Sequence, residues 1–189
     1  MVAPSWTVVH VHCTERKLQG THKMILILEG ADGTGKSTLS KELSRYGFQV
    51  MHRPFDPTYL DFFDAYRKLL LSLTEDIILD RSFISEIVYG PILRGQSRLS
   101  PQELIELLRI TANRRGRVLY CYAAEHVIRN RLESDAVVHG KLIPKLPKLL
   151  QAYEDVIDQV SRHVSVFRIK TDEAAPAEIA SDVMKRAVQ

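Results

Sequence analysis

The sequence is short of cysteine and of long apolar runs, and each shortage excludes a class of protein. Its two cysteines, Cys13 and Cys121, lie far apart without metal-ligand spacing, which argues against a secreted disulfide framework and favours a reducing compartment. No apolar run approaches the roughly 18 residues that a membrane span needs, and the N-terminus lacks the pattern of a signal peptide. We therefore expect a cytoplasmic protein without a membrane partner.

Charge of one sign is not in large excess either. The chain has 26 Lys and Arg residues against 23 Asp and Glu residues, and no basic run is long enough to suggest a nucleic-acid arm. No nucleic-acid partner is therefore expected. With 189 residues, of which 45% are hydrophobic, the chain is long enough for one globular domain with a buried core.

Residues 1–23 differ from the rest of the chain, because the first clear strand begins only at Met24. We expect this segment to be an irregular extension or to add an edge strand at Val8 to Val11, and residues 24–189 to form the domain. The segment also holds four metal-ligating side chains, but they lack a second well-spaced group, so a metal site is not favoured. These side chains are His10, His12, Cys13 and His22.

From Met24 onward, predicted strands alternate with predicted helices. Unbroken or alternating apolar runs predict strands at residues 25–29, 48–52, 76–80, 117–122 and 164–169. Helical spacing and capping residues predict helices up to Gly47, from Asp56 and Pro57, from Ser82, from Ser100 to Gly116, over about 147–162 and from about 176 to the end. This alternation predicts a three-layer α/β fold with a five-stranded, mostly parallel sheet and helices on both faces.

The segment "ILILEGADGTGKSTLSKEL", residues 25–43, joins a strand, a glycine-rich loop and a helix start. Its glycines, lysine and serine fit the phosphate-binding loop pattern, in which backbone N–H groups and a helix N-terminus hold phosphates. The ligand expected here is a nucleoside triphosphate, with Lys36 spanning its outer two phosphates and Ser37 holding Mg²⁺. The predicted ATP-binding residues here are Gly30, Ala31, Asp32, Gly33, Thr34, Gly35, Lys36, Ser37 and Thr38.

The same segment resembles the opening of thymidylate kinases, whose usual form is a strand followed by E-G-x-[DE]-G-x-G-K-[ST]-T. A second segment, "LDRSFISEIVYG", is similar to the family's D-R-Y-x-x-S-x-x-A-Y-Q, with matches at Asp80, Arg81, Ser85 and Tyr89. Ser82, in place of the family tyrosine, is closer to the E-R-S of deoxyribonucleoside kinases. A third segment, "YCYAAEHVIRNRL", resembles the family's fourth strand and the helix whose arginine lies over the adenine of ATP, and Arg131 falls at that place.

The chain also departs from this family. Fewer than thirty residues separate the second strand from Asp80, which is too few for the two helices that thymidylate kinases have there. The missing helix normally carries the aromatic that stacks on thymine, so the resemblance does not transfer base specificity. The segment "HRPFDP" resembles the family's R-E-P-G or R-F-P segment, which implies Arg53 as a phosphate ligand and Asp56 as a sugar or base contact. Asp56 has an equally sufficient role as a helix N-cap.

Phosphoryl transfer needs cations around the moving group and shelter from water, which gives roles to two further side chains besides Lys36. Lys36 supplies one cation. Asp80 ends an apolar strand at the sheet edge that carries the loop, where a carboxylate can orient the water shell of Mg²⁺; a buried pair with Arg81 is the structural alternative. Arg81 can hold an acceptor phosphate by two parallel hydrogen bonds. We therefore predict Lys36, Asp80 and Arg81 as catalytic residues, and Ser37 and Asp80 as metal-binding residues.

Shelter from water is expected from a lid at about residues 129–147. In thymidylate kinases a basic side chain of the loop or of the lid helps catalysis, and this loop has Gly33 and Thr34, so the resemblance implies a lid cation. A solvated charged helix is the alternative for each candidate. The candidates are Arg129, Arg131, His139, Lys141 and Lys145.

Together these features predict a kinase that uses ATP and Mg²⁺ to phosphorylate a nucleoside monophosphate, with a deoxynucleotide favoured. A kinase of nucleosides or other small alcohols is the first alternative, and a regulatory ATPase without a small-molecule acceptor is the second. Members of the family often form dimers, so a homodimer is also implied. The predicted substrate-binding residues are Asp32, Arg53, Asp56, Arg81, Ser85 and Lys141.

Overall fold

The computed structural model describes residues 8–9, 23–52, 61–134 and 140–187. Strands and helices alternate along these residues, as the sequence predicts. The strands are β1 (Val8–Val9), β2 (Ile25–Glu29), β3 (Gln49–His52), β4 (Ile77–Asp80), β5 (Arg117–Tyr122) and β6 (Val166–Lys170). The helices are α1 (Lys36–Ser44), α2 (Phe62–Ser72), α3 (Phe83–Arg94), α4 (Pro101–Asn113), α5 (Glu125–Glu133), the 3₁₀ helix η1 (Ile143–Lys145), α7 (Leu146–Val160) and α8 (Pro176–Ala187).

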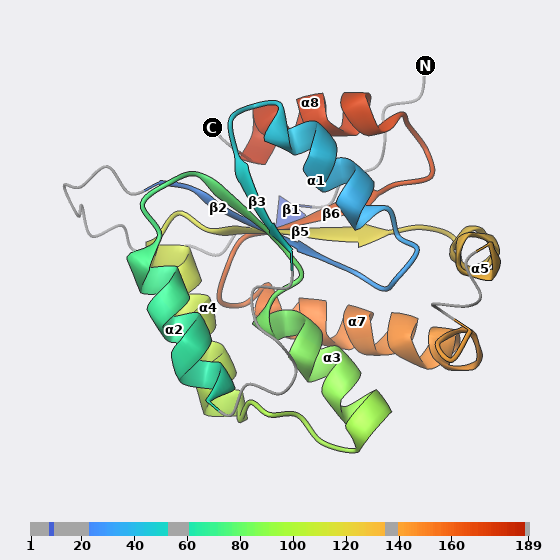
Figure 1. Cartoon of the computed structure of the whole chain (residues 1–189), viewed down its shortest axis with the longest axis horizontal. Coiled ribbons are helices and arrows are strands. Elements are labelled where there is room, and N and C mark those ends of the chain that lie inside the picture. The colour runs from blue at the N-terminus through green and yellow to red at the C-terminus, as the bar shows by residue number, and fades with distance from the viewer. Residues whose placement is uncertain (1–7, 10–22, 53–60, 135–139, 188–189) are drawn as a thin grey trace.

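The strands form one sheet in the order β1-β6-β5-β2-β4-β3. Strands β2 to β6 are parallel, and β1 adds an antiparallel edge strand beside β6. Helices α1 and α8 cover one face of the sheet, and α2, α3, α4 and α7 cover the other (Figure 1). The predicted three-layer fold is therefore confirmed. Because β4 and β5 flank β2 on opposite sides, a crevice opens beyond the carboxyl end of β2, where open α/β sheets bind ligands.

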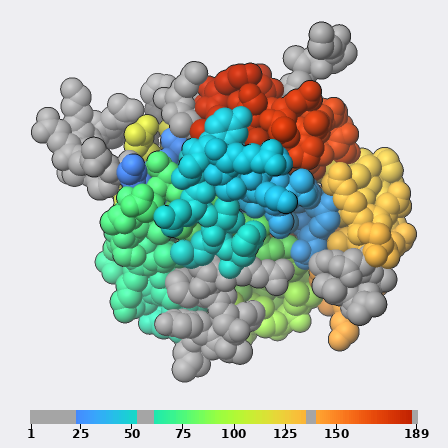
Figure 2. Space-filling model, turned by 45° about the horizontal axis from the view of Figure 1, so that its top comes forward, coloured from blue at the N-terminus to red at the C-terminus, as the bar shows by residue number. Residues whose placement is uncertain are grey.

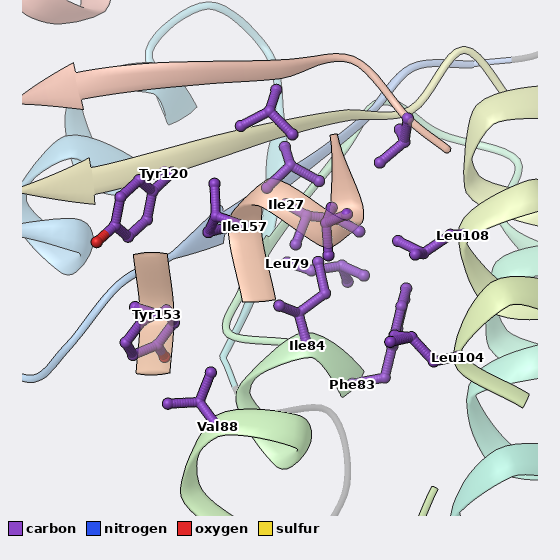
Figure 3. Packing of buried hydrophobic residues seen from close by; sticks show 14 of the residues in the cluster. Ile27, Leu79, Phe83, Ile84, Val88, Leu104, Leu108, Tyr120, Tyr153 and Ile157 are labelled. Atoms are coloured by element: carbon purple, nitrogen blue, oxygen red, sulfur yellow. The ribbon is translucent and has the colours of Figure 1, made fainter. Parts of the chain in front are cut away.

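The side chains of β2 alternate between two cores, because successive residues of a strand point to opposite faces. Ile25 and Ile27 pack in the larger core with the helices α2, α3, α4 and α7. Leu26 and Leu28 pack in the smaller core with α1 and α8. Burial on both faces explains the unbroken apolar run of this strand. Figure 3 shows part of the larger core, including Ile27, Leu79, Phe83, Ile84, Val88, Leu104, Leu108, Tyr120, Tyr153 and Ile157.

Helix α4 begins as predicted, because Ser100 and Glu103 form a complete capping box. The helix ends before the predicted terminating residue Gly116, and Arg115 adopts the left-handed conformation instead, with φ of 55°. Gly116 has another role: a Cβ atom there would lie 2.3 Å from the Cγ2 atom of Thr111. Glycine is therefore required at this position because Thr111 lies too close to leave room for a side chain.

The predicted helix start at Asp56 and Pro57 falls among residues that the structure does not describe. Helix α2 begins at Phe62, and Asp61 is its N-cap, since the Asp61 carboxylate accepts a hydrogen bond from the Asp64 backbone N–H at 3.0 Å. Asp56 itself lies outside the described residues. Between β3 and β4 the described residues contain the single helix that the short interval allows.

Two kinds of feature are absent from the described part of the chain. No helix there has the length and apolar character that a membrane crossing requires. The same residues contain no group of three or more His, Cys, Asp or Glu side chains arranged to hold a metal ion. The four metal-ligating side chains of the N-terminal segment lie outside the residues that the structure describes.

Removal of residues 1–23 is expected to leave a folded, active protein. Met24 is only 5% exposed, and its backbone N–H donates to the Asp76 carboxylate at 2.7 Å, so the domain is anchored from this residue onward. The two-residue strand β1 contributes few backbone hydrogen bonds, each worth about 0.5–1.5 kcal/mol, so the free energy of unfolding is expected to fall by less than about 3 kcal/mol. Chemical denaturation and a turnover assay test this. An insoluble or inactive protein would show that the segment is essential to the sheet or the site.

Candidate functional site

The glycine-rich loop joins β2 to α1 at the centre of the sheet. Gly30 has φ of 141°, and a Cβ atom there would lie 2.2 Å from the backbone oxygen of Cys121 on the neighbouring strand β5. Gly35 is the left-handed N-cap of α1, with φ of 83°. The Thr34 hydroxyl donates to the Ala31 carbonyl at 2.7 Å, which closes the loop on itself. These contacts fix a cradle of bare backbone next to the N-terminus of a helix, the usual arrangement for binding phosphate.

Lys36 is the first residue of α1, and its side chain turns back into the loop. The ammonium group donates to the carbonyl oxygens of Gly30, at 2.8 Å, and of Ala31, at 2.7 Å. Burial lowers the pKa of Lys36 to about 8, and the nearby charge of Arg81 acts in the same direction. A buried ammonium whose hydrogen bonds go to the neutral oxygens of Gly30, Ala31 and Thr34 is well suited to accept an anion beside it.

Asp80, at the end of β4, is 4% exposed and lies beside the start of α1. One of its carboxylate oxygens, Oδ2, accepts a hydrogen bond from the Ser37 hydroxyl at 2.9 Å and lies 2.8 Å from Nδ1 of His52. The pairing register of the sheet places His52 directly opposite Asp80. The ion-pair partner of Arg81 in the described structure is Asp32, whereas Asp80 contacts Ser37 and His52. Ser37 and Asp80 together offer the hard oxygen donors that Mg²⁺ prefers, so these residues fit that ion.

Arg81 follows β4 directly and forms an ion pair with Asp32 of the loop. Its guanidinium also lies over the ring of Tyr89, 5.2 Å from the ring centre. The Tyr89 hydroxyl donates to the Asp32 carboxylate at 3.0 Å and accepts from the Asp32 backbone N–H at 3.1 Å. Three elements, the loop, the end of β4 and helix α3, thus meet around one arginine.

A cavity of about 490 Å³ opens over these groups. It brings together most of the residues predicted from the loop and from the end of β4, and the lining residues are Asp32, Gly33, Gly35, Lys36, Ser37, Thr38, His52, Asp80 and Arg81. A second cavity, of about 320 Å³, also lies at the loop and is lined by Gly33, Gly35, Thr38, Leu39, Arg131, Thr171, Pro176 and Ile179. Gly33, Gly35 and Thr38 line both cavities, so the two hollows adjoin at the loop.

Arg131 lies in the second cavity, where its guanidinium donates to the Gly33 carbonyl at 3.0 Å. In Figure 2 the yellow-orange segment that includes α5 lies against the blue atoms around the loop, in agreement with this contact. Thr171, the residue after β6, also contacts the loop, because its hydroxyl donates to the Thr34 carbonyl at 2.7 Å.

Other predicted residues lie away from the first cavity or outside the described residues. The Ser85 hydroxyl donates to the Glu29 carboxylate at 2.7 Å, and Lys141 is exposed in the turn before η1. Arg129 pairs with Glu125 one helical turn earlier, as a solvated charged helix does. The predicted residues Arg53, Asp56 and His139 lie outside the described residues.

Two residues of the site were missed by the sequence analysis as individual candidates, His52 and Thr171. His52 belongs to the "HRPFDP" segment, but only the pairing of β3 with β4 reveals that it faces Asp80. Thr171 follows β6 and reaches the loop from a distant part of the chain. Neither carries a local motif.

Comparison of the sequence with known proteins gives a partial match to one named kinase. Over 76 residues the chain is 42% identical to a provisionally named thymidylate kinase of Acidianus bottle-shaped virus (isolate Italy/Pozzuoli), which covers 35% of this chain and 47% of that protein. The match thus spans about half of the relative's length. No family model matches the chain.

Solved structures resemble the whole fold. The YorR protein of Bacillus subtilis, determined in complex with phosphorylated GDP, has a TM-score of 0.72 at 23% identity and covers 85% of this chain and 94% of its own. Deoxyadenosine kinase of M. mycoides, with products dCMP and dCDP, has a TM-score of 0.59 at 17% identity and covers 86% and 97%. Shikimate kinase of Acinetobacter baumannii has a TM-score of 0.55 at 14% identity and covers 89% and 94%.

These comparisons confirm the P-loop kinase fold and the resemblance to thymidylate kinases that the sequence indicates. The acceptors named for the similar structures include a deoxynucleoside and shikimate, so the fold by itself does not select the acceptor. The acceptor must be inferred from the side chains of the site.

Proposed function

We propose that this protein is a kinase that transfers the terminal phosphoryl group of ATP to a nucleoside monophosphate, with a deoxynucleotide favoured. The observation that carries the proposal is the pair of buried cations, Lys36 and Arg81, on the wall of one cavity beside the Ser37 and Asp80 oxygens. Phosphoryl transfer depends on cations placed around the moving group, and this wall supplies two from rigid elements.

Each side chain has a separate role in this proposal. The loop backbone and Lys36 bind the donor phosphates, and Arg131 lies in the second cavity, where the base and sugar of ATP fit. Ser37 and Asp80 would hold Mg²⁺, which supplies charge neutralisation at the transferred phosphoryl group when bound. Arg81 and Asp32 face the first cavity and bind the acceptor. Residues 129–147 are proposed as the lid, and a homodimer stays a prediction.

Arg81 favours a phosphorylated acceptor over a neutral one. A guanidinium with a side chain only 11% exposed has lost most of its water, and a phosphate dianion offers it two oxygens at once. The second candidate, a nucleoside or small-alcohol kinase, is supported by one observation: Asp32 already balances the charge of Arg81. A neutral acceptor is therefore tolerated electrostatically, although it supplies no anion of its own to the Arg81 guanidinium.

An acceptor panel distinguishes these functions. We expect a nucleoside 5′-monophosphate to be phosphorylated with a kcat/KM about 100-fold or more above that of its nucleoside, because hydrogen bonds to a charged group are worth about 1.5–3 kcal/mol each. The measurement is ADP release in the presence of ATP, Mg²⁺ and each of the common deoxynucleosides, ribonucleosides, their monophosphates and shikimate. Steady ADP release without any acceptor, unaffected by the panel, would favour the regulatory ATPase.

A further inference from the structure

Glu29, the last residue of β2, is a buried carboxylate outside both cavities. It is 0% exposed and follows Ile25 and Ile27 on the strand face that packs against α3 and α7. Its oxygen Oε1 accepts hydrogen bonds from the Ser82 backbone N–H at 2.8 Å and from the Ser82 hydroxyl at 2.7 Å. The Ser85 backbone N–H also donates to Oε1, at 3.3 Å.

The second carboxylate oxygen of Glu29 is held from two helices. The Ser85 hydroxyl of α3 donates to Oε2 at 2.7 Å, and the Tyr153 hydroxyl of α7 donates to it at 3.3 Å. Figure 3 shows the Tyr153 ring in the core between α7 and the sheet, near Tyr120 of β5. Burial raises the pKa of Glu29, against the opposing effect of the Ser85 and Ser82 donors. A carboxylate in this place therefore costs stability, and an apolar side chain would be the simpler way to fill the core.

The donors show what Glu29 holds. Ser82 is the N-cap of α3, and Ser85 is the third residue of the helix, so Glu29 caps this helix from a neighbouring strand. The Ser82 hydroxyl in turn accepts a hydrogen bond from the Ile84 backbone N–H at 3.1 Å. The start of α3 is thus fixed to the end of β2.

Arg81 lies immediately before this capped helix start, in an unusual backbone conformation. Its φ is 74°, in the left-handed region that non-glycine residues rarely adopt, at a cost of about 1–3 kcal/mol that the surroundings must offset. Two contacts to β2 enclose the residue: the Arg81 backbone N–H donates to the Leu28 carbonyl at 3.1 Å, and the next N–H, of Ser82, donates to Glu29. Consecutive residues of β2 therefore hold the strained turn from both sides.

We propose that Glu29 is a positioning residue for Arg81, which holds the strained turn so that the guanidinium lies against Asp32 on the cavity wall. This inference rests on the proposed function, in which Arg81 binds the acceptor. Glu29 does not line the cavity, so we expect its effect on catalysis to pass through Arg81 and not through contact with a substrate.

The test compares three substitutions that act differently on the Glu29 contacts. Glu29→Leu removes both acceptor oxygens, and we expect kcat/KM for the acceptor to fall about 100-fold while the affinity for ATP changes by less than about threefold, because a misplacement of about 1 Å has such an effect. Glu29→Gln keeps an oxygen for Ser82, and its amide can donate to the Ser85 and Tyr153 hydroxyls, so it is expected to restore most of the activity. Tyr153→Phe is the matched control, since it removes one hydrogen bond from the oxygen that does not contact Ser82.

A double-mutant comparison separates positioning from general stability. In an Arg81→Ala background, Glu29→Leu is expected to lower turnover by no more than about threefold further, because the group on which it acts is absent. If Glu29→Leu does not fold, Ser82→Ala replaces it, with a smaller loss of the same kind confined to the acceptor. The proposal would be overturned if folded Glu29→Leu, or folded Ser82→Ala in its place, had the same kcat/KM for the acceptor as Tyr153→Phe. It would also be overturned if Glu29→Leu lowered turnover by as large a factor in the Arg81→Ala background as in the wild-type protein.

A crystal structure of the Glu29→Leu variant tests the positioning role of Glu29 separately from the proposed kinase function. An inactive wild-type protein on every acceptor would refute the proposed function, but it would not decide the role of Glu29. In the structure of Glu29→Leu, or of Ser82→Ala where the former does not fold, we expect Arg81 to leave the left-handed region or its guanidinium to leave Asp32. Retention of both features would overturn the positioning role whatever the activity.

Discussion

Replacement of Lys36 by alanine is expected to lower kcat by about three orders of magnitude, because it removes a preorganised cation from the phosphates during transfer. The ammonium group is held at the loop by two carbonyl oxygens, so the wild-type protein needs little rearrangement to place it. Single-turnover measurements with ATP and the best acceptor of the panel give the rate of the chemical step directly. A comparable loss in kcat and kcat/KM would place the interaction in the transition state.

The Lys36→Ala protein is expected to stay folded. Because the pKa of Lys36 lies near 8 in the folded protein and at 10.5 in an exposed chain, folding disfavours the protonated form at neutral pH. Removal of the Lys36 side chain loses its hydrogen bonds to the Gly30 and Ala31 carbonyls, but it also removes the cost of burying a charge. Lys41→Ala is the matched control, since this exposed lysine lies on the same helix outside the cavity. Near-normal turnover by Lys36→Ala would refute the kinase proposal.

The parts of the site predicted from sequence are those whose geometry is local. The glycine spacing of the loop states which positions need bare backbone, and the apolar runs on both sides of it identify β2 and α1. The residue Asp80 could be placed at the same sheet edge because it ends another apolar run. For these groups, sequence neighbours are also neighbours in the folded chain.

The remaining parts depend on contacts between distant segments. The register of β3 against β4 places His52 opposite Asp80, and no pattern around His52 contains that information. The left-handed conformation of Arg81 follows from contacts with β2, although side chains other than glycine disfavour it. The N-cap of α2 is not identified from the sequence for a different reason: both Asp56 and Asp61 precede a helical aromatic pattern, and sequence rules give each the role of an N-cap.

Substitution of Arg81 by alanine is expected to impair the acceptor far more than the donor. The KM of the monophosphate is expected to rise about 30-fold or more and kcat to fall about 100-fold, because two charge-assisted hydrogen bonds to the phosphate are lost. The affinity for ATP is expected to change by less than about threefold, since the proposed ATP contacts come from the loop, Lys36 and Arg131. Alanine at φ of 74° carries the same kind of backbone strain as arginine, so the comparison reports mainly on the side chain.

The loss of Arg81 also removes its ion pair with the Asp32 carboxylate. The effect of that loss on stability has to be distinguished from the loss of acceptor binding. The Tyr89 hydroxyl still donates to Asp32, so the variant is expected to fold with a lowered melting temperature. Arg81→Lys keeps a positive charge near Asp32 but loses the two parallel hydrogen bonds, so its acceptor KM is expected to stay high while its stability recovers. Arg45→Ala, on the exposed end of α1, is the control for removal of an arginine as such. Efficient phosphorylation of a free nucleoside by the wild-type protein, or an Arg81→Ala defect confined to ATP, would transfer the assignment to the nucleoside or small-alcohol kinase.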